Sequence, residues 1–327
     1  MSECERSAWR VAVSRRGHGW TRRTLQDRFD CVVGEPDELM AMDEAERAAI
    51  AGMATLMSPV DAALIDALPN LEIIASFGVG YDHVDAAHAA QRGVIVTHTP
   101  HVLDDEVADT AIGLLLNTLR ELPRAEIWLR MGKWSSEGAY PLTPLTLRGR
   151  KVGIFGLGRI GMAVARRLEG FGVAIHYHNR SQRDDVAYAY HATLDGLAHA
   201  CDTLVSVVPG TPQTRHAINA DILARLGPDG VLVNVGRGSV VDETALGEAL
   251  RAGTIAAAGL DVFEDEPNVP QALLDAPNAC LLPHVASASV HTRQAMGQLV
   301  IDNLADWFER GTVRTPVPEA AHLVEGR

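Results

Sequence analysis

Three residues of reactive type lie in the second half of the chain, each beside residues that restrict its backbone. Arg237 stands between two glycines in the run Asn234-Val-Gly-Arg-Gly, which leaves its guanidinium little steric obstruction. Glu266 precedes a proline, and His284 follows one. Taken singly, a loop arginine usually forms a salt bridge, and a lone histidine is usually packed or solvated. Together, the guanidinium, the carboxylate and the imidazole make these residues candidates for anion binding and proton transfer.

All three residues come after short apolar runs that predict strands. These runs cover 231–235, 257–262 and 279–282, and the segment 244–251 between the first two has helical composition. Strands that alternate with helices favour a parallel sheet with helices on both faces. In such a doubly wound sheet, ligands bind outside the carboxyl ends of the strands. The three candidates are therefore expected at one edge of one sheet.

The stretch 151–181 predicts a strand–helix–strand unit with a glycine-rich first turn. Gly156, Gly158 and Gly161 give the pattern G-x-G-x-x-G directly after an apolar run. The first glycine permits the tight turn, the second lets a pyrophosphate approach the backbone, and the third lets the helix pack on the strand. The helix N-terminus favours an anion. The stretch therefore predicts a dinucleotide site.

The end of the second strand of this unit indicates which dinucleotide is bound. An acid about 20 residues past the glycines usually holds the ribose of NAD, but the chain has Asn179, Arg180 and Ser181 there. An arginine with neighbouring hydrogen-bond donors suits a 2′-phosphate. The alternative is that Arg180 is an ordinary surface arginine and that Asn179 closes a turn. We expect NADPH (NADP+) to be preferred, with Arg183 assisting and with NADH possible.

The remaining segments predict a second α/β unit and a long helix. Short apolar runs alternate with helical segments over residues 1–99, and the run 71–77 breaks into Gly78-Val-Gly-Tyr-Asp. Residues 104–131 predict one long helix with an apolar face, and 132–149 predict a loop. The fold class is therefore α/β with two doubly wound, Rossmann-like domains.

Net charge, cysteine placement and the length of apolar runs indicate which binding partners and which cellular compartment to expect. The 327 residues carry a formal net charge of −13, which disfavours a nucleic-acid partner or an anionic membrane surface. Cys4, Cys31, Cys201 and Cys280 are scattered, so we expect reduced, mostly buried thiols and neither a disulfide framework nor a metal site. No signal peptide or membrane span is apparent. We expect a cytoplasmic protein.

Motifs along nearly the whole chain resemble the D-isomer-specific 2-hydroxyacid dehydrogenase family. The segments Asn179-Arg-Ser and 281–293 are further similar to its glyoxylate and hydroxypyruvate reductase branch, which includes NADPH-dependent hydroxyphenylpyruvate reductases. We expect no regulatory extension like that of many phosphoglycerate dehydrogenases, because the sequence continues only briefly after its last predicted helix. Glu266 is an acid, unlike the amide of formate dehydrogenases. The family motifs are GVGYDHVD (78–85), GLGRIG (156–161), NVGRG (234–238), GLDVFEDEP (259–267) and LPHVASAS (282–289).

The resemblance implies roles for the three candidates. His284 would be the acid/base, Glu266 its carboxylate partner and Arg237 the cation that orients the substrate. Reduction of a 2-oxo acid requires that charge developing on the carbonyl oxygen is stabilised and then protonated, which a histidinium can do. A neighbouring carboxylate favours the charged imidazole near neutral pH.

The resemblance also implies further contacts and an assembly. Residues 1–99 and 288–327 would form a discontinuous substrate-binding domain that closes on a dinucleotide-binding domain of residues 100–287 about hinges near 98–101 and 286–289. A homodimer is expected, joined through the cofactor domains, the predicted helix 104–131 and the following loop, from which Trp134, Tyr140 or Leu142 would reach a neighbouring subunit's site. The implied substrate contacts are Val79, Gly80 and Ser287, and the implied cofactor contacts are Arg159, Ile160, Val208, Pro209, Val235 and Asp261.

Three functions remain open from the sequence. The first is NADPH-dependent reduction of glyoxylate or hydroxypyruvate to the D-2-hydroxy acid. The second is reduction of aromatic 2-oxo acids such as phenylpyruvate or hydroxyphenylpyruvate, with Met53, Leu56, Met57 and Phe77 as candidate pocket residues, although core packing explains each of them as well. The third is a non-enzymatic, dinucleotide-sensing binding protein, for which no partner-binding extension is apparent.

Overall fold

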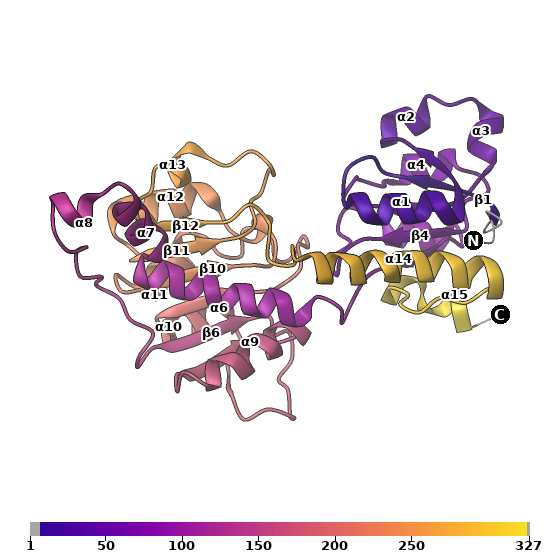
Figure 1. The fold of residues 1–327 in the computed structure, drawn as a ribbon. Coiled ribbons are helices and arrows are strands. Elements are labelled where there is room, and N and C mark those ends of the chain that lie inside the picture. Colours follow the sequence, from indigo (N-terminus) through magenta and orange to yellow (C-terminus); the bar gives the residue numbers. More distant parts are fainter. Residues whose placement is uncertain (1–6, 326–327) are drawn as a thin grey trace. The chain divides into compact units, whose positions relative to one another are not determined.

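The computed structural model describes residues 7–325, and the chain divides into two compact units (Figure 1). The first unit contains the chain up to Leu103 and again from Ser289, and the second contains Asp104–Ala288. The sequence predicts these boundaries at 99/100 and 287/288. Which unit binds substrate and which binds the cofactor stays a prediction.

The first unit is built on a five-stranded parallel sheet in the order β2-β1-β3-β4-β5. Helices α1 and α14 pack together, and Leu39, Leu64 and Ala89 bring α2, α4 and α5 into a core cluster with the sheet. The strands are β1 (Ser7–Val13), β2 (Phe29–Val33), β3 (Ile50–Thr55), β4 (Ile73–Ser76) and β5 (Ile95–Thr97). The helices are α1 (Gly19–Arg28), α2 (Pro36–Met40), α3 (Glu44–Ala48), α4 (Ala62–Ala67), α5 (Ala86–Gln91), α14 (Val290–Arg310), η2 (Pro318–Ala320) and α15 (Ala321–Glu325).

The second unit is built on a seven-stranded parallel sheet in the order β12-β11-β10-β9-β6-β7-β8. The chain order reverses between β6 and β9, which is the switch point where doubly wound sheets bind ligands. Its strands are β6 (Lys151–Phe155), β7 (Ala174–His178), β8 (Ala189–Tyr190), β9 (Thr203–Ser206), β10 (Val231–Asn234), β11 (Ala257–Leu260) and β12 (Ala279–Leu281). Its helices are α6 (Asp104–Arg120), α7 (Leu122–Arg130), α8 (Lys133–Ser136), α9 (Arg159–Glu169), α10 (Leu194–Ala200), α11 (Ala220–Leu226), η1 (Gly238–Val240), α12 (Glu243–Ala252) and α13 (Gln271–Leu274).

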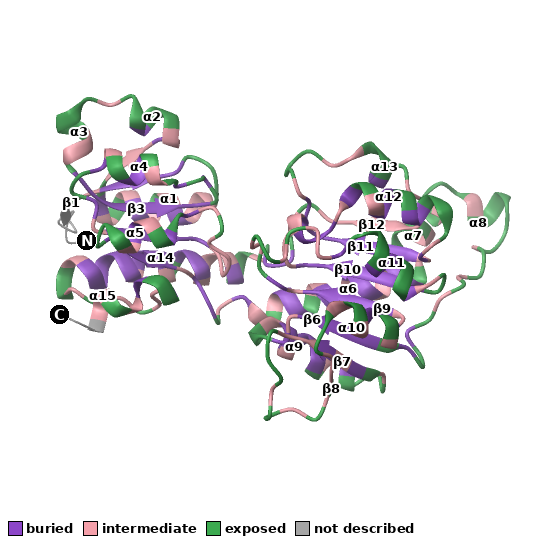
Figure 2. Ribbon diagram, turned by 180° about the vertical axis from the view of Figure 1, so that it is seen from behind, coloured by how far each residue is buried: buried purple, intermediate pink, exposed green. Residues whose placement is uncertain are grey.

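Apolar side chains explain why both sheets form. The central strands β3, β4, β9, β10 and β11 are buried along their whole length, as expected for parallel strands covered on both faces (Figure 2). In the second unit, α6 packs on α9 and on β10 and β11, while residues of α10, α11 and α12 join a separate core cluster with the sheet. The predicted fold class is confirmed.

The single helix predicted for residues 104–131 is wrong in one respect. Helix α6 ends at Arg120, Glu121 adopts a left-handed backbone with φ 50°, and α7 starts at Leu122. Pro123 lies in the first turn of α7. Because proline has no N–H to continue the hydrogen-bond ladder of α6, a new helix begins there.

No helix within residues 7–325 has the length and apolarity needed to cross a membrane. Cys201 is buried, whereas Cys31 and Cys280 are partly exposed, and Cys4 lies outside the described residues.

Candidate active site

Glu266 and His284 form a hydrogen-bonded pair at the carboxyl edge of the second unit's sheet. His284 Nδ1 lies 2.7 Å from Glu266 Oε2, and each side chain is 30% exposed. The other carboxylate oxygen of Glu266 accepts the Phe263 N–H at 3.0 Å. Burial alone would raise the pKa of Glu266, but these hydrogen bonds and the charges of His284 and Arg237 lower it below its usual value. The carboxylate is therefore charged at neutral pH and can stabilise an imidazolium.

Asp261 holds the backbone on which His284 stands. The Asp261 side chain is fully buried, and its two oxygens accept the N–H groups of Val285 and Ala286 at 2.8 and 2.9 Å. The His284 N–H donates to the Asp261 carbonyl at 2.8 Å, and His284 has a left-handed φ of 53°. Burial raises the pKa of Asp261, although the two N–H donors oppose this effect. Asp261 therefore fixes the turn that presents the imidazole.

Arg237 follows β10, and the glycines around it allow close backbone packing. A Cβ on Gly238 would lie 1.8 Å from the Phe263 carbonyl carbon, and one on Gly236 would lie 2.6 Å from the Val208 oxygen. The Arg237 carbonyl accepts from the buried Asn234 amide at 2.9 Å. Arg237 thus lies beside the loop that carries Glu266, and its charge contributes to the lowered pKa of that carboxyl.

The glycine-rich turn between β6 and α9 fits a pyrophosphate. Gly156 has φ 101°, and a Cβ on Gly161 would lie 2.2 Å from the Gly156 oxygen. A Cβ on Gly158, by contrast, would meet no atom within 4 Å. Among the residues that the structure describes, no acceptor pairs with the Arg159 or Ile160 N–H groups. The turn therefore combines open space with unpaired donors at the N-terminus of an 11-residue helix.

The segment after β7 separates the predicted phosphate-binding residues into two groups. Asn179 is engaged with the glycine turn, because its Oδ1 accepts the Leu157 N–H at 2.6 Å and its Nδ2 donates to the Leu157 oxygen at 3.3 Å. Arg183 donates to the same Leu157 oxygen and pairs with Asp185. Arg180 and Ser181 are exposed, and within the described chain neither side chain has a hydrogen-bond or ion-pair partner. Arg180 is thus the cation available for a ligand here.

The other predicted contacts lie as follows. In the second unit, Val208 packs beside Gly156, and the Val235 N–H donates to the Ser206 oxygen at 3.1 Å, so both belong to the ends of neighbouring strands. Pro209 follows Val208, and Ser287 is 9% exposed within the turn held by Asp261.

Val79 and Gly80 belong to the first unit and follow β4. The Gly78 N–H donates to Thr99 Oγ1 at 3.0 Å, and His98 Nδ1 lies 2.9 Å from the Val79 oxygen. Neither the Val79 nor the Gly80 N–H donates to any residue in the described part of the chain. His98 and Thr99 thus hold the turn in place, and the N–H groups of Val79 and Gly80 stay available to an anion.

The sequence did not predict two further carboxylates, Glu243 and Glu264, near Glu266 in the chain or in contact with its loop. The Glu264 N–H donates to Glu243 Oε1 at 2.8 Å, and Glu243 is only 8% exposed at the start of α12. Burial is the largest cause of the raised pKa of Glu243. Glu264 in turn pairs with Arg215 and with His216. In the sequence, Glu243 looks like any acid in the first turn of a helix. Its burial and its hydrogen bond to the Glu264 N–H are seen only in the folded structure.

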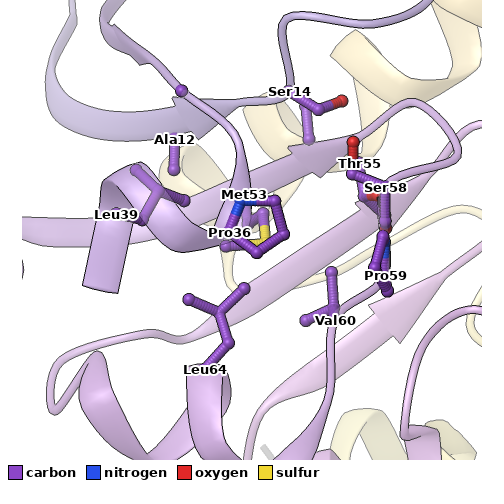
Figure 3. Close-up of a pocket in the computed structure, with 12 residues that line it drawn as sticks. Ala12, Ser14, Pro36, Leu39, Met53, Thr55, Ser58, Pro59, Val60 and Leu64 are labelled. Carbon is purple, nitrogen blue, oxygen red and sulfur yellow. Dashed lines mark hydrogen bonds between the residues drawn. The ribbon is translucent and has the colours of Figure 1, made fainter. Parts of the chain in front are cut away.

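The first unit contains a small pocket that is lined by none of the active-site residues described above. It lies between the ends of β1 and β3 and helices α2 and α4 (Figure 3). Its hydroxyl groups are already used: Ser14 accepts the Leu56 N–H, Thr55 donates to the Ser58 oxygen, and Ser58 donates to Glu35. These bonds fix the loop that follows β3.

Comparison with known proteins identifies relatives of the chain. A profile described as "D-isomer specific 2-hydroxyacid dehydrogenase, NAD binding domain" matches residues 112–286. A glyoxylate/hydroxypyruvate reductase A of Arabidopsis thaliana is 44% identical over 295 residues, which cover 90% of this chain and 94% of the relative. A hydroxyphenylpyruvate reductase of Plectranthus scutellarioides is 49% identical over 257 residues, covering 79% and 82%.

A solved structure resembles the chain over nearly its full length. It is an NADPH-dependent glyoxylate/hydroxypyruvate reductase of Sinorhizobium meliloti in complex with NADP and malonate. The sequences are 57% identical, the TM-score is 0.92, and the match covers 96% of this chain and 98% of the other.

Proposed function

The chain belongs to the D-isomer-specific 2-hydroxyacid dehydrogenase family, and we propose that it is an NADPH-dependent reductase that converts glyoxylate or hydroxypyruvate to the D-2-hydroxy acid. The observation that carries this proposal is the 2.7 Å pair of His284 and Glu266 at the sheet edge that also bears the glycine turn. The names of the Arabidopsis and Sinorhizobium relatives support the substrate class.

His284 is the general acid in this proposal. Its Nδ1 is occupied by Glu266, so Nε2 is the nitrogen that faces a substrate and donates the proton to the carbonyl oxygen. Glu266 stabilises the imidazolium before the proton is transferred. Asp261 keeps the ring in place through Val285 and Ala286.

Arg237 binds the substrate in this proposal. The guanidinium binds the substrate carboxylate and stabilises the charge that develops on the carbonyl oxygen. The family resemblance assigns Val79 and Gly80 to the substrate as well, and their unpaired N–H groups in the first unit are suited to an anionic ligand. Ser287 completes the set of proposed substrate contacts.

The residues present fit a dinucleotide with a 2′-phosphate. The open space at Gly158 and the N–H groups of Arg159 and Ile160 would hold the pyrophosphate, and Arg180 with Ser181 would hold the 2′-phosphate. Val208 and Pro209 would flank the adenosine, and Val235 and Asp261 would lie toward the nicotinamide. When bound, NADPH supplies the hydride. The NADP-bound Sinorhizobium structure supports this cofactor, and NADH remains a second, weaker cofactor.

Reduction of aromatic 2-oxo acids is the second candidate, because the Plectranthus relative is named a hydroxyphenylpyruvate reductase. Of the four residues considered for an aromatic pocket, Met53, Leu56 and Phe77 are at most 3% exposed and belong to the core, whereas Met57 is 52% exposed. The dehydrogenase family and the reductase names of the relatives argue against a non-enzymatic dinucleotide sensor.

We further propose that the protein works as a homodimer in the cytoplasm. Single exposed apolar residues are ordinary, but several large ones on one segment of the chain are typical of an interaction surface. Six large apolar side chains between residues 122 and 142 are at least 47% exposed, and they lie on α7, on α8 and beside them. They are Leu122, Ile127, Leu129, Met131, Trp134 and Leu142.

A panel of both cofactors against glyoxylate, hydroxypyruvate and phenylpyruvate tests the proposed function. Loss of the reduced-nicotinamide absorbance should be fastest with NADPH and one of the two small acids. A higher kcat/KM for phenylpyruvate would replace the first candidate by the second. Binding of NADPH without turnover of any 2-oxo acid would contradict both.

A further inference from the structure

We propose that Glu243 is a positioning residue of the reaction: its carboxylate holds the peptide N–H of Glu264 and thereby fixes the turn from which Glu266 reaches His284. The inference rests on the proposed function and deepens it, because it assigns a role in proton transfer to a side chain that binds neither substrate nor cofactor. It is carried by the contacts that link Glu243 to the imidazole through one turn of backbone.

The turn that carries Glu266 directs two successive N–H groups to two different carboxylates. The Phe263 N–H donates to Glu266 Oε1 at 3.0 Å, and the next one, that of Glu264, donates to Glu243 Oε1 at 2.8 Å. The other oxygen of Glu266 lies 2.7 Å from His284 Nδ1. Because Glu266 is bonded to its own turn, a displacement of the turn also displaces the carboxylate that faces the imidazole. Glu243 therefore acts on His284 through the backbone.

The peptide between Phe263 and Glu264 also contacts the loop of Arg237. A Cβ on Gly238 would lie 1.8 Å from the Phe263 carbonyl carbon and 2.3 Å from the Glu264 nitrogen. One peptide unit thus has the backbone of Gly238 against it and the Glu243 carboxylate on its N–H. Holding this peptide fixes the loop of the guanidinium relative to the turn that carries Glu266.

Glu243 is not needed to cap the helix on which it stands. Asp242 already caps α12, because its Oδ1 accepts the Ala245 N–H at 3.0 Å. Within the described part of the chain, the Glu264 N–H is the one hydrogen-bond donor to the Glu243 carboxylate. The contact with the neighbouring turn therefore accounts for this buried acid.

The burial of Glu243 is unfavourable for the fold, which also points to a role in the site. Burial is the largest cause of its raised pKa; the Glu264 N–H and the charge of His216 act in the opposite direction, whereas the charges of Glu264 and Glu266 add to the effect. An uncharged side chain of similar size would avoid this penalty. A side chain that opposes stability is expected where it serves activity.

The side chain of Glu264 anchors the same turn to a third segment. Its carboxylate lies 2.6 Å from Arg215 Nη2 and 2.9 Å from His216 Nε2, and the His216 N–H donates to the Ser239 oxygen at 2.8 Å. Segments that follow β9, β10 and β11 are therefore joined at Glu264. These ion pairs are partly exposed and contribute little, whereas the contact of Glu243 is buried.

Three variants separate the reach of the Glu243 side chain from its charge. Glu243→Gln keeps an oxygen that can accept the Glu264 N–H, Glu243→Asp keeps the charge but is one carbon shorter, and Glu243→Leu loses both. With NADPH and glyoxylate, Glu243→Gln should keep kcat within about threefold of the unmodified protein. Glu243→Asp and Glu243→Leu should lower kcat by about 10- to 100-fold, as expected for misplaced catalytic groups, and leave KM for NADPH unchanged. A kcat for Glu243→Asp equal to or above that of Glu243→Gln would overturn the inference.

A titration of the His284 ring by NMR gives a readout that does not depend on turnover. The signal is assigned by its loss in His284→Ala. The pH at which the ring loses its proton should be lower in Glu243→Asp than in the unmodified protein, because Glu266 no longer stabilises the imidazolium, and should stay close to the unmodified value in Glu243→Gln. An unchanged midpoint in folded Glu243→Asp, judged by circular dichroism, would overturn the inference even if kcat falls.

Glu248→Leu is the matched control, since Glu248 is an exposed acid on the same helix. It should leave both kcat and the titration of the His284 ring unchanged, and a loss of kcat equal to that of Glu243→Leu would contradict a specific role for Glu243. Absence of turnover by the unmodified protein would defeat the proposed function, whereas the titration would still decide whether Glu243 positions Glu266.

Discussion

His284 is positioned by two carboxylates with different tasks. Glu266 binds the ring at Nδ1, whereas Asp261 binds the backbone N–H groups of the two residues that follow. The first contact favours the imidazolium, and the second fixes where its Nε2 points. The family resemblance assigns Asp261 to the nicotinamide, and the structure adds this second task to it.

Replacing His284 should remove the proton donor. We expect His284→Ala to lower kcat for glyoxylate by about 10²- to 10⁴-fold, the usual contribution of general acid catalysis. NADPH binding, followed by fluorescence titration, should change little. Near-normal turnover would remove His284 from the mechanism.

Glu266 gives a prediction on pH. Its folded-state pKa lies below its usual value, so its charge contributes to stability above the unfolded pKa, and this contribution is lost as pH falls through the folded value. Glu266→Gln should therefore lose this contribution to the free energy of unfolding near neutral pH, and its free energy of unfolding, measured by urea denaturation, should fall less steeply as the pH is lowered. The variant should also have a lower kcat at neutral pH. A profile that keeps the same slope below pH 5 as the unmodified protein would contradict this assignment.

Arg180 decides between the two cofactors. Loss of a charge-assisted hydrogen bond costs about 1.5–3 kcal/mol, so Arg180→Ala should raise KM for NADPH by about tenfold or more and leave KM for NADH nearly unchanged. Arg251→Ala, on an exposed position of α12, is the matched control. Equal effects on NADPH and NADH would exclude a 2′-phosphate contact.

At the level of elements, the sequence predicted those helices, strands and turns whose formation depends on residues close together in the chain. The glycine turn, the strands before Arg237 and His284 and the end of β7 follow from apolar runs and glycine spacing. The two-residue strand β8 and the four-residue helix α13 are too short to show a period. The buried Glu243 and the commitment of Asn179 to Leu157 depend on contacts between distant segments, which no sequence window contains.

Two glycines of the same turn should respond differently to alanine. A methyl group on Gly161 would clash with the Gly156 oxygen, so Gly161→Ala should destabilise the fold by about 1–3 kcal/mol. Gly158→Ala places its methyl group in open space, so it should keep the melting temperature but weaken NADPH binding. Thermal unfolding and a binding titration separate the two effects. Normal NADPH affinity in Gly158→Ala would argue against a pyrophosphate at this turn.

At the scale of the whole molecule, the apolar group on α7, α8 and the following loop predicts a homodimer of the 35.1 kDa chain. The double variant Ile127→Asp/Leu129→Asp should shift the protein to a monomer, because charged groups cannot be buried unpaired in such an interface. Sedimentation velocity measures the change. Leu274→Asp, also on an exposed apolar position but on α13, should leave the assembly unaltered. A monomeric unmodified protein would contradict the proposed dimer.

The central claim is that the chain reduces a 2-oxo acid with NADPH, and isotope transfer tests it most directly. The protein is incubated with glyoxylate or hydroxypyruvate and NADPH that carries deuterium at the transferred position, and the product is examined by mass spectrometry and chiral chromatography. The account predicts one deuterium on C2 and, from hydroxypyruvate, only the D-hydroxy acid. Unlabelled product, the L-isomer, or no product with either acid would contradict it.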